Sequence, residues 1–247
     1  MMNYLLSIIL VPFLAFQLQQ NHAIQPVNAE IPLLYVPDDS QKLATAKIAP
    51  SPWEKIYDSA RLQRYGLKKE VFQRAYTGYT RMKNRGLISR NNIITICDFG
   101  QSYRRKRMYV VDLDDYKLLV NTLVAHGQGS GGEYANSFGN EADSHKSSLG
   151  FYTTAETYYG EHGYSLRLRG REPGINDRAY DRDVVVHSSE YVSEEYLREN
   201  NKIGRSWGCP AIPEKINQKV INLIRNGSCF FIYHPAKNYL KKTKLAA

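Results

Sequence analysis

The sequence predicts a mainly β fold with added helices (α+β), and two patterns in it indicate this class. From residue 92 onward, short runs rich in β-branched and aromatic residues alternate with Gly, Asp and Asn, as in strands joined by turns. Before residue 87, apolar residues recur at helical spacing with Lys and Arg between them. The 247 residues suit one good-sized domain with a helical extension, or at most two small domains.

The first 29 residues are predicted to be an export signal. Residues 4–16 (YLLSIILVPFLAF) form an uncharged apolar run of signal-peptide length, too short for a confident transmembrane helix. Val27-Asn28-Ala29 fits a signal-peptidase site, and Ala23 is a second candidate. Because no Lys or Arg precedes the run, an uncleaved N-terminal anchor is the alternative. We expect an exported protein, periplasmic or associated with the cell envelope, with no stable membrane span after cleavage.

Two helices are expected before the β region. Residues 30–51 contain three prolines and form a predicted linker. Residues 52–63 fit a short helix, and residues 67–86 carry Val71, Phe72, Ala75, Tyr76 and Tyr79 at helical spacing. We therefore expect an N-terminal helical extension over residues 52–86, followed by the main domain over residues 87–240.

The main domain is expected to begin with a strand meander and to continue with further strands and two helices. The expected strands are 92–100, 107–115, 116–126, 149–160, 164–170, 182–187 and 228–235, and the expected helices are 193–200 and 214–226. Residues 127–148 form a long Gly/Ser/Asn-rich segment. Loops of this length in a compact domain are usually functional.

Charge and cysteine content narrow the function classes. Residues 1–29 contain no charged side chain, so the formal charge of +9 belongs to the mature protein and favours anionic polymers, membrane surfaces or cell-wall material as partners. The export signal argues against nucleic acid. Cys97 and Cys229 lie in apolar strand-like runs and are expected to be buried, whereas Cys209 follows a Gly-rich turn. The spacing of Cys and His predicts no metal site and no other cofactor site.

The candidate chemistry lies between residues 184 and 210. A hydrophobic strand ends at His187, and the turn Gly204–Pro210 (GRSWGCP) carries Cys209. A thiol with an ordinary pKa of about 8.5 needs a neighbouring imidazole to act as a nucleophile at neutral pH. Backbone N–H groups in a tight turn can then stabilise an oxyanion. The combination indicates cysteine acyl transfer.

This segment resembles the L,D-transpeptidase catalytic domain (YkuD-type), whose signature is a His, a variable stretch, and then Ser/Thr-His-Gly-Cys. The matching residues are His187, Ser206, Gly208 and Cys209. The segments 123–132, 147–170 and 175–177 are similar to the murein branch of this family, which has a Ser-Trp-Gly-Cys-Pro motif. The resemblance covers roughly residues 85–235 and implies a β-sandwich or barrel.

The resemblance also implies an activity on peptidoglycan stem peptides. Such enzymes cut the L-to-D bond before the terminal D-residue of a tetrapeptide stem, hold the stem as a thioester and pass it to a diamino acid amine, forming a 3→3 cross-link. Water as acceptor gives L,D-carboxypeptidase activity, and carbapenems acylate these enzymes. By resemblance Cys209 is the nucleophile, His187 the base and Ser188 its orienting neighbour, while Gly208 and Cys209, with Trp207, supply oxyanion N–H groups.

Two departures from the family pattern leave substrate recognition open. Trp207 replaces the motif His, and Ala211 stands where an Arg commonly follows the Cys. Arg205, Arg167 and Arg169 are candidates to replace that Arg. The predicted substrate-binding residues are His126, Ser206, Arg205, Tyr158 and Arg167.

Two other function classes compete with acyl transfer. Metal-dependent hydrolysis could use His126 and His187 with nearby carboxylates, but no HxH or HExxH spacing supports it. A non-catalytic wall-binding module could use the basic surface alone. The sequence indicates neither the stem diamino acid, nor the acceptor, nor the oligomeric state.

Overall fold

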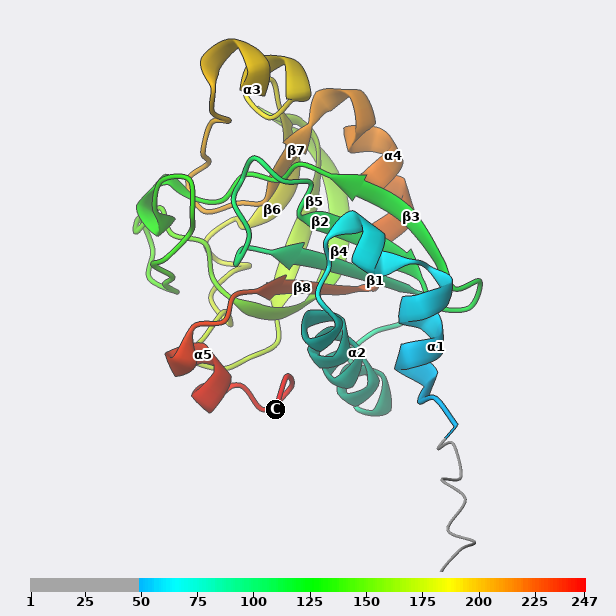
Figure 1. The fold of residues 1–247 in the computed structure, drawn as a ribbon. Coiled ribbons are helices and arrows are strands. Elements are labelled where there is room, and N and C mark those ends of the chain that lie inside the picture. The colour runs from blue at the N-terminus through cyan, green and yellow to red at the C-terminus, as the bar shows by residue number, and fades with distance from the viewer. Residues whose placement is uncertain (1–48) are drawn as a thin grey trace, which may run out of the picture. The chain divides into compact units, whose positions relative to one another are not determined.

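The computed structural model describes residues 49–247, and its framework is an eight-stranded sheet (Figure 1). The strand order is β3-β2-β1-β8-β4-β5-β6-β7. The strands are β1 (Ile93–Asp98), β2 (Met108–Asp112), β3 (Lys117–Thr122), β4 (Gly150–Gly160), β5 (Gly163–Gly170), β6 (Val185–Ser189), β7 (Ala211–Pro213) and β8 (Cys229–Tyr233). The antiparallel β1-β2-β3 meander is confirmed, as is the mainly β class with added helices.

The two edges of the sheet approach each other and nearly close a barrel. Just after β3, the Ala125 N–H donates a hydrogen bond to the Ala211 carbonyl of β7 at 2.8 Å. A second isolated bridge joins Gly127 to Ser206. This closure places the start of the 127–148 loop against the turn that carries Cys209.

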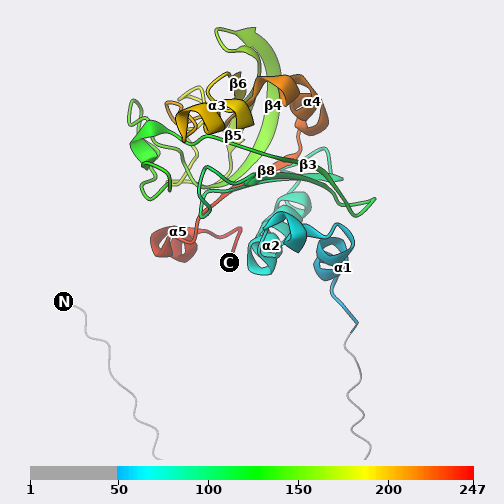
Figure 2. The same ribbon diagram turned by 45° about the horizontal axis from the view of Figure 1, so that its top comes forward.

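Helices cover both sides of the curved sheet. They are α1 (Pro52–Ser59), the 3₁₀ turn η2 (Leu62–Tyr65), α2 (Lys69–Asn84), the 3₁₀ turn η3 (Gln128–Ser130), α3 (Glu194–Asn200), α4 (Glu214–Ile224) and α5 (Lys237–Lys242). Figure 2 shows α1, α2 and α5 on one side of β8 and β3, and α3 and α4 on the other. The expectation of one helix over residues 52–63 was wrong, because Arg61 adopts a left-handed conformation (φ 52°) after α1.

Helix α2 packs directly on the sheet. Its residues Phe72, Ala75 and Met82 are fully buried in the same apolar cluster as the strand residues. Gly78 allows the close approach: a Cβ there would lie 2.0 Å from the Phe151 ring of β4. The predicted helical extension therefore shares its core with the β region, while the boundary between residues 86 and 87 stays a prediction.

Cys97 in β1 and Cys229 in β8 are fully buried, as expected, and both are free thiols. Burial raises the pKa of each, which makes them poor nucleophiles. The predicted export signal and nearly all of the linker lie outside the described residues. Within residues 49–247, no helix is long and apolar enough to cross a bilayer.

Candidate active site

His187 lies in strand β6, and its side chain is almost completely buried. The side chain is 3% exposed, and its Nδ1–H donates a hydrogen bond to the Ser188 carbonyl at 2.9 Å. A carbonyl can only accept, so this contact leaves the lone pair on Nε2. Burial lowers the pKa of His187 to about 4. The imidazole is therefore neutral at pH 7 and can accept a proton at Nε2.

The register of β6 and β7 brings Cys209 beside β6. His187 pairs with Ala211 in parallel register, so Cys209 lies near Val185, and the Val185 N–H contacts its Sγ at 3.5 Å. The thiol S–H points to the Asp183 carbonyl at 3.6 Å. Burial raises the pKa of Cys209. No hydrogen bond among the described residues joins Sγ to His187, so the thiol rests as S–H, turned towards the start of β6.

Ser206 holds the Cys209 turn together from inside. Its Oγ accepts the Gly208 N–H at 3.1 Å and donates to the Cys209 carbonyl at 2.5 Å. The side chain is buried, so the structure places Ser206 inside the turn, and its predicted contact to substrate stays a prediction. Gly208 has φ 123°, and a Cβ on neighbouring Gly127 would lie 2.7 Å from the Gly208 Cα. Both positions therefore need glycine.

The backbone N–H groups of the Cys209 turn differ in whether they already have a hydrogen-bond partner. The Gly208 N–H, expected to face an oxyanion, is engaged by Ser206. The N–H groups of Trp207 and Cys209 have no hydrogen-bond partner within residues 49–247. These two are therefore the free donors of the turn, and Gly208 would have to exchange its bond to join them.

His145 reaches the turn from the long loop, although no sequence motif pointed to it. Its ring stacks on Trp207 at 4.8 Å between centroids, with 8° between the planes. Gln128 Nε2 lies 3.0 Å from the His145 Nδ1. An imidazole from the 127–148 loop thus contacts the residue that replaces the motif His.

Arg182 is a second residue that sequence reasoning missed. It contacts Ser148 Oγ at 2.7 Å and the Lys146 carbonyl at 2.9 Å, and a Cβ on Gly208 would lie 3.6 Å from its Nη2. Its charge lowers the pKa of the Cys209 thiol, which partly offsets burial. Arg182 therefore joins the long loop to the turn and supplies a cation near the thiol.

His126, expected to contact substrate, is instead an interior residue. It is fully buried, and Arg107 Nη2 donates to its Nδ1 at 2.7 Å. Burial, together with the Arg107 charge, lowers the pKa of His126 to about 3. The His126 carbonyl accepts the Ser206 N–H at 3.1 Å. His126 thus stabilises the Cys209 turn through its backbone carbonyl.

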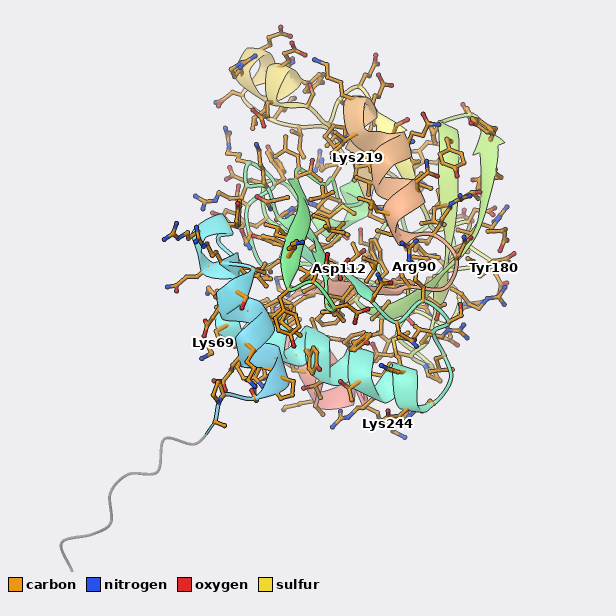
Figure 3. All side chains as sticks on the ribbon, turned by 90° about the vertical axis from the view of Figure 1, so that its right-hand side faces the viewer. Lys69, Arg90, Asp112, Tyr180, Lys219 and Lys244 are labelled. Carbon is orange, nitrogen blue, oxygen red and sulfur yellow. The ribbon has the colours of Figure 1, made fainter. Side chains whose placement is uncertain are left out.

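Tyr158 and Arg167, both predicted to bind substrate, contact each other, and their role in substrate binding stays a prediction. The Arg167 guanidinium is 4.9 Å from the Tyr158 ring centroid and pairs with Asp183 at 2.5 Å, whose carbonyl contacts Cys209. Arg167 and Arg169 also pack on Tyr180, which Figure 3 labels at the molecular surface.

Arg205 lies at a separate pocket. Its Nη1 donates to the Gly131 carbonyl at 2.6 Å. It lines a pocket of about 300 Å³ together with Tyr103, Gln128, Gly132, Tyr196, Lys202, Ile203 and Gly204. Over residues 49–247, no three His, Cys, Asp or Glu side chains gather as metal ligands would.

Comparison with known families and solved structures gives the following matches. The family model described as L,D-transpeptidase catalytic domain matches residues 63–233. Similar solved structures include L,D-transpeptidases from Mycobacterium smegmatis (11% identity, 58% of this chain and 59% of that chain, TM-score 0.35), Stackebrandtia nassauensis (13%, 73% and 75%, 0.34) and L,D-transpeptidase 3 from Mycobacterium tuberculosis (10%, 58% and 61%, 0.37). The match spans 59% of the Mycobacterium smegmatis protein. No curated protein matches the sequence.

Proposed function

This chain belongs to the family of L,D-transpeptidase catalytic domains, and we propose that it forms 3→3 cross-links between peptidoglycan stem peptides through a thioester on Cys209. The observation that carries the proposal is the pairing of β6 and β7. That pairing sets the buried, neutral His187 beside a turn whose free thiol is Cys209.

The first half-reaction begins with rotation of the Cys209 side chain away from Asp183 and towards His187. His187 takes the thiol proton at Nε2, and the sulfur attacks the carbonyl carbon of the L-to-D bond in a tetrapeptide stem. The C–N bond then breaks, and His187 returns the proton to the amine of the departing D-residue. The stem remains attached to Sγ as a thioester.

Backbone N–H groups of the turn stabilise the oxyanion of the tetrahedral intermediate. Cys209 and Trp207 offer free donors for this role, and Gly208 contributes if its bond to Ser206 is exchanged. The Ser188 carbonyl holds the imidazole in the tautomer that the base needs.

The second half-reaction transfers the stem to the side-chain amine of a diamino acid in another stem. The amine attacks the thioester carbonyl, His187 removes its extra proton, and the sulfur leaves and is reprotonated. Arg167 packs on Tyr158 and pairs with Asp183, whose carbonyl contacts the thiol, and we propose Tyr158 and Arg167 as the contacts to the polar stem. The protein would act after export, in the periplasm or cell envelope.

Water as acceptor would make the chain an L,D-carboxypeptidase, which is the closest alternative function. The nucleophile and base are the same in both reactions, so only the acceptor differs. Defined tetrapeptide muropeptides, incubated with and without a second stem, separate the two by their products.

Intact-mass spectrometry after incubation with imipenem tests the nucleophile. Imipenem is chosen because a solved L,D-transpeptidase is in complex with it. We expect one covalent adduct on the chain and none on Cys209→Ala, while Cys97→Ala, which removes a buried thiol, keeps the adduct.

Failure of a folded, reduced protein to form the adduct would contradict the proposal and favour a non-catalytic wall-binding module. Turnover of muropeptides that is lost on chelation, but survives in Cys209→Ala, would favour metal-dependent hydrolysis instead.

A further inference from the structure

The β4–β5 hairpin carries a second histidine onto the face of His187. The hairpin closes at the pair Gly160 and Gly163, which leaves Glu161 and His162 as its turn. The rings of His162 and His187 are stacked, with 4.5 Å between centroids and 25° between planes. No sequence motif pointed to a role for His162.

Contacts outside the stack hold the hairpin tip in place. Ser188 Oγ donates to the His162 carbonyl at 3.1 Å, and Asn217 of α4 donates to the Tyr164 carbonyl at 2.7 Å. Gly163 has φ 71°, a conformation that few other residues adopt. Three separate features therefore fix the approach of His162 to His187.

The stack constrains His187 in a direction that its hydrogen bond does not. The Nδ1–H bond to the Ser188 carbonyl acts in the plane of the imidazole and sets its tautomer. A ring packed on the imidazole face resists tilting out of that plane. Ser188 contributes to both constraints, since its carbonyl holds the ring of His187 and its hydroxyl holds the hairpin.

The same stack also separates His187 from water. His187 is 3% exposed although His162, its cover, is exposed. Burial is the largest cause of the low pKa of His187, and the charge of His162 lowers it further. Removal of the His162 ring would let water reach one face of the base.

We propose that His162 is a positioning residue for the reaction: its ring covers one face of the His187 imidazole, fixes the ring plane and excludes water from it. This inference rests on the proposed function, because it assigns His187 as the base. It adds a residue from the hairpin to a site otherwise built by β6 and the Cys209 turn.

Three variants of the full chain test the inference. His162→Ala removes the covering ring, His162→Phe keeps a flat ring that cannot titrate, and Glu161→Gln changes the neighbouring turn residue as a matched control. His162→Gln replaces the alanine variant if thermal denaturation shows that the latter does not fold. The first measurement is an NMR titration of the His187 ring without ligand, and the second is the rate of Cys209 acylation by imipenem between pH 4 and 8.

In His162→Ala we expect the pKa of His187 to move from about 4 towards 6.5. Acylation at pH 7 should fall about tenfold, because a misplaced base loses catalytic power even when it is neutral. His162→Phe should keep the pKa of His187 well below 6.5, because burial is the largest cause of the shift, and the acylation rate should stay within about twofold of the parent rate, since an aromatic ring preserves the stack. Glu161→Gln should match the parent chain.

An unchanged His187 titration and acylation rate in His162→Ala would overturn the inference, and so would a His162→Phe variant that behaves like alanine. A parent chain that imipenem does not acylate would overturn the proposed function instead. The ligand-free titration would still decide whether His162 covers His187, so the two failures are distinguishable.

Discussion

At Ser206, one hydroxyl group binds two backbone groups that follow Trp207. Its Oγ accepts from the Gly208 N–H and donates to the Cys209 carbonyl. We expect Ser206→Ala to lower the free energy of unfolding by about 1–3 kcal/mol, because a buried N–H loses its acceptor. Urea denaturation measures this change.

The same variant should acylate more slowly, since the turn that holds Cys209 is less fixed. Ser59→Ala is the control, because Ser59 is exposed at the end of α1. Equal stability of the two variants would show that the hydroxyl does not hold the turn.

His187 and His126 also predict how stability depends on pH. Burial lowers their pKa to about 4 and about 3, from an ordinary value of 6.5. Between these values the unfolded chain binds protons that the folded chain does not, so stability rises with pH. We expect the free energy of unfolding to fall as the pH drops from about 6.5 to 4, and to be steady from pH 7 to 8.

Urea denaturation at a series of pH values measures this dependence. His126→Gln should show a shallower fall, since one of the two buried imidazoles is gone. A stability that is flat from pH 7 to pH 4 would contradict the assignment of both rings as neutral and buried.

The predicted and the missed site residues differ in how they reach the site. His187 and Cys209 stand in local motifs, so residue chemistry and spacing sufficed to select them. His145, His162 and Arg182 arrive from a loop, a hairpin turn and the segment before β6. Their positions depend on strand register and on closure of the sheet edges, which a local pattern does not specify.

At the scale of elements, the close packing of α2 on the sheet depends on Gly78. A Cβ at Gly78 would lie 2.0 Å from a Phe151 ring atom, and Phe151 is itself fully buried against Phe231. We expect Gly78→Ala to destabilise the chain by about 1–3 kcal/mol through overpacking, although alanine favours a helix.

Thermal and urea denaturation test the expectation, with Gly132→Ala as the control because a Cβ there meets nothing within 4 Å. A Gly78→Ala chain that is more stable than the parent would mean that α2 can shift on the sheet at little cost.

Most elements could be predicted from the sequence, including the short helix α3, expected over 193–200 and found over Glu194–Asn200, but a few could not. The strands β1, β2, β3, β4, β5 and β8 and the helix α2 fall where alternation or helical spacing placed them. Strand β7 has three residues and α5 has six, so neither has a recognisable period. The break after α1 depends on a left-handed Arg61, a conformation that non-glycine residues seldom adopt.

At the scale of the whole molecule, the net positive charge predicts electrostatic attraction to anionic cell-wall polymers. The formal charge of +9 lies entirely after residue 29, and exposed charges attract anionic polymers over about 10 Å at 0.1 M salt. We expect residues 30–247 to bind sacculi that carry anionic polymers at low salt, and to lose at least about tenfold in binding at 0.5 M, where screening is stronger.

Co-sedimentation over a salt series measures that binding, and sacculi stripped of their anionic polymers are the matched control. Cys209→Ala should bind as the parent chain does, because the thiol adds no charge and the attraction is spread over the surface. Binding to stripped sacculi that resists 0.5 M salt would contradict the electrostatic account. It would instead favour recognition by specific contacts, for which Tyr158 and Arg167, which contact each other, are the proposed residues.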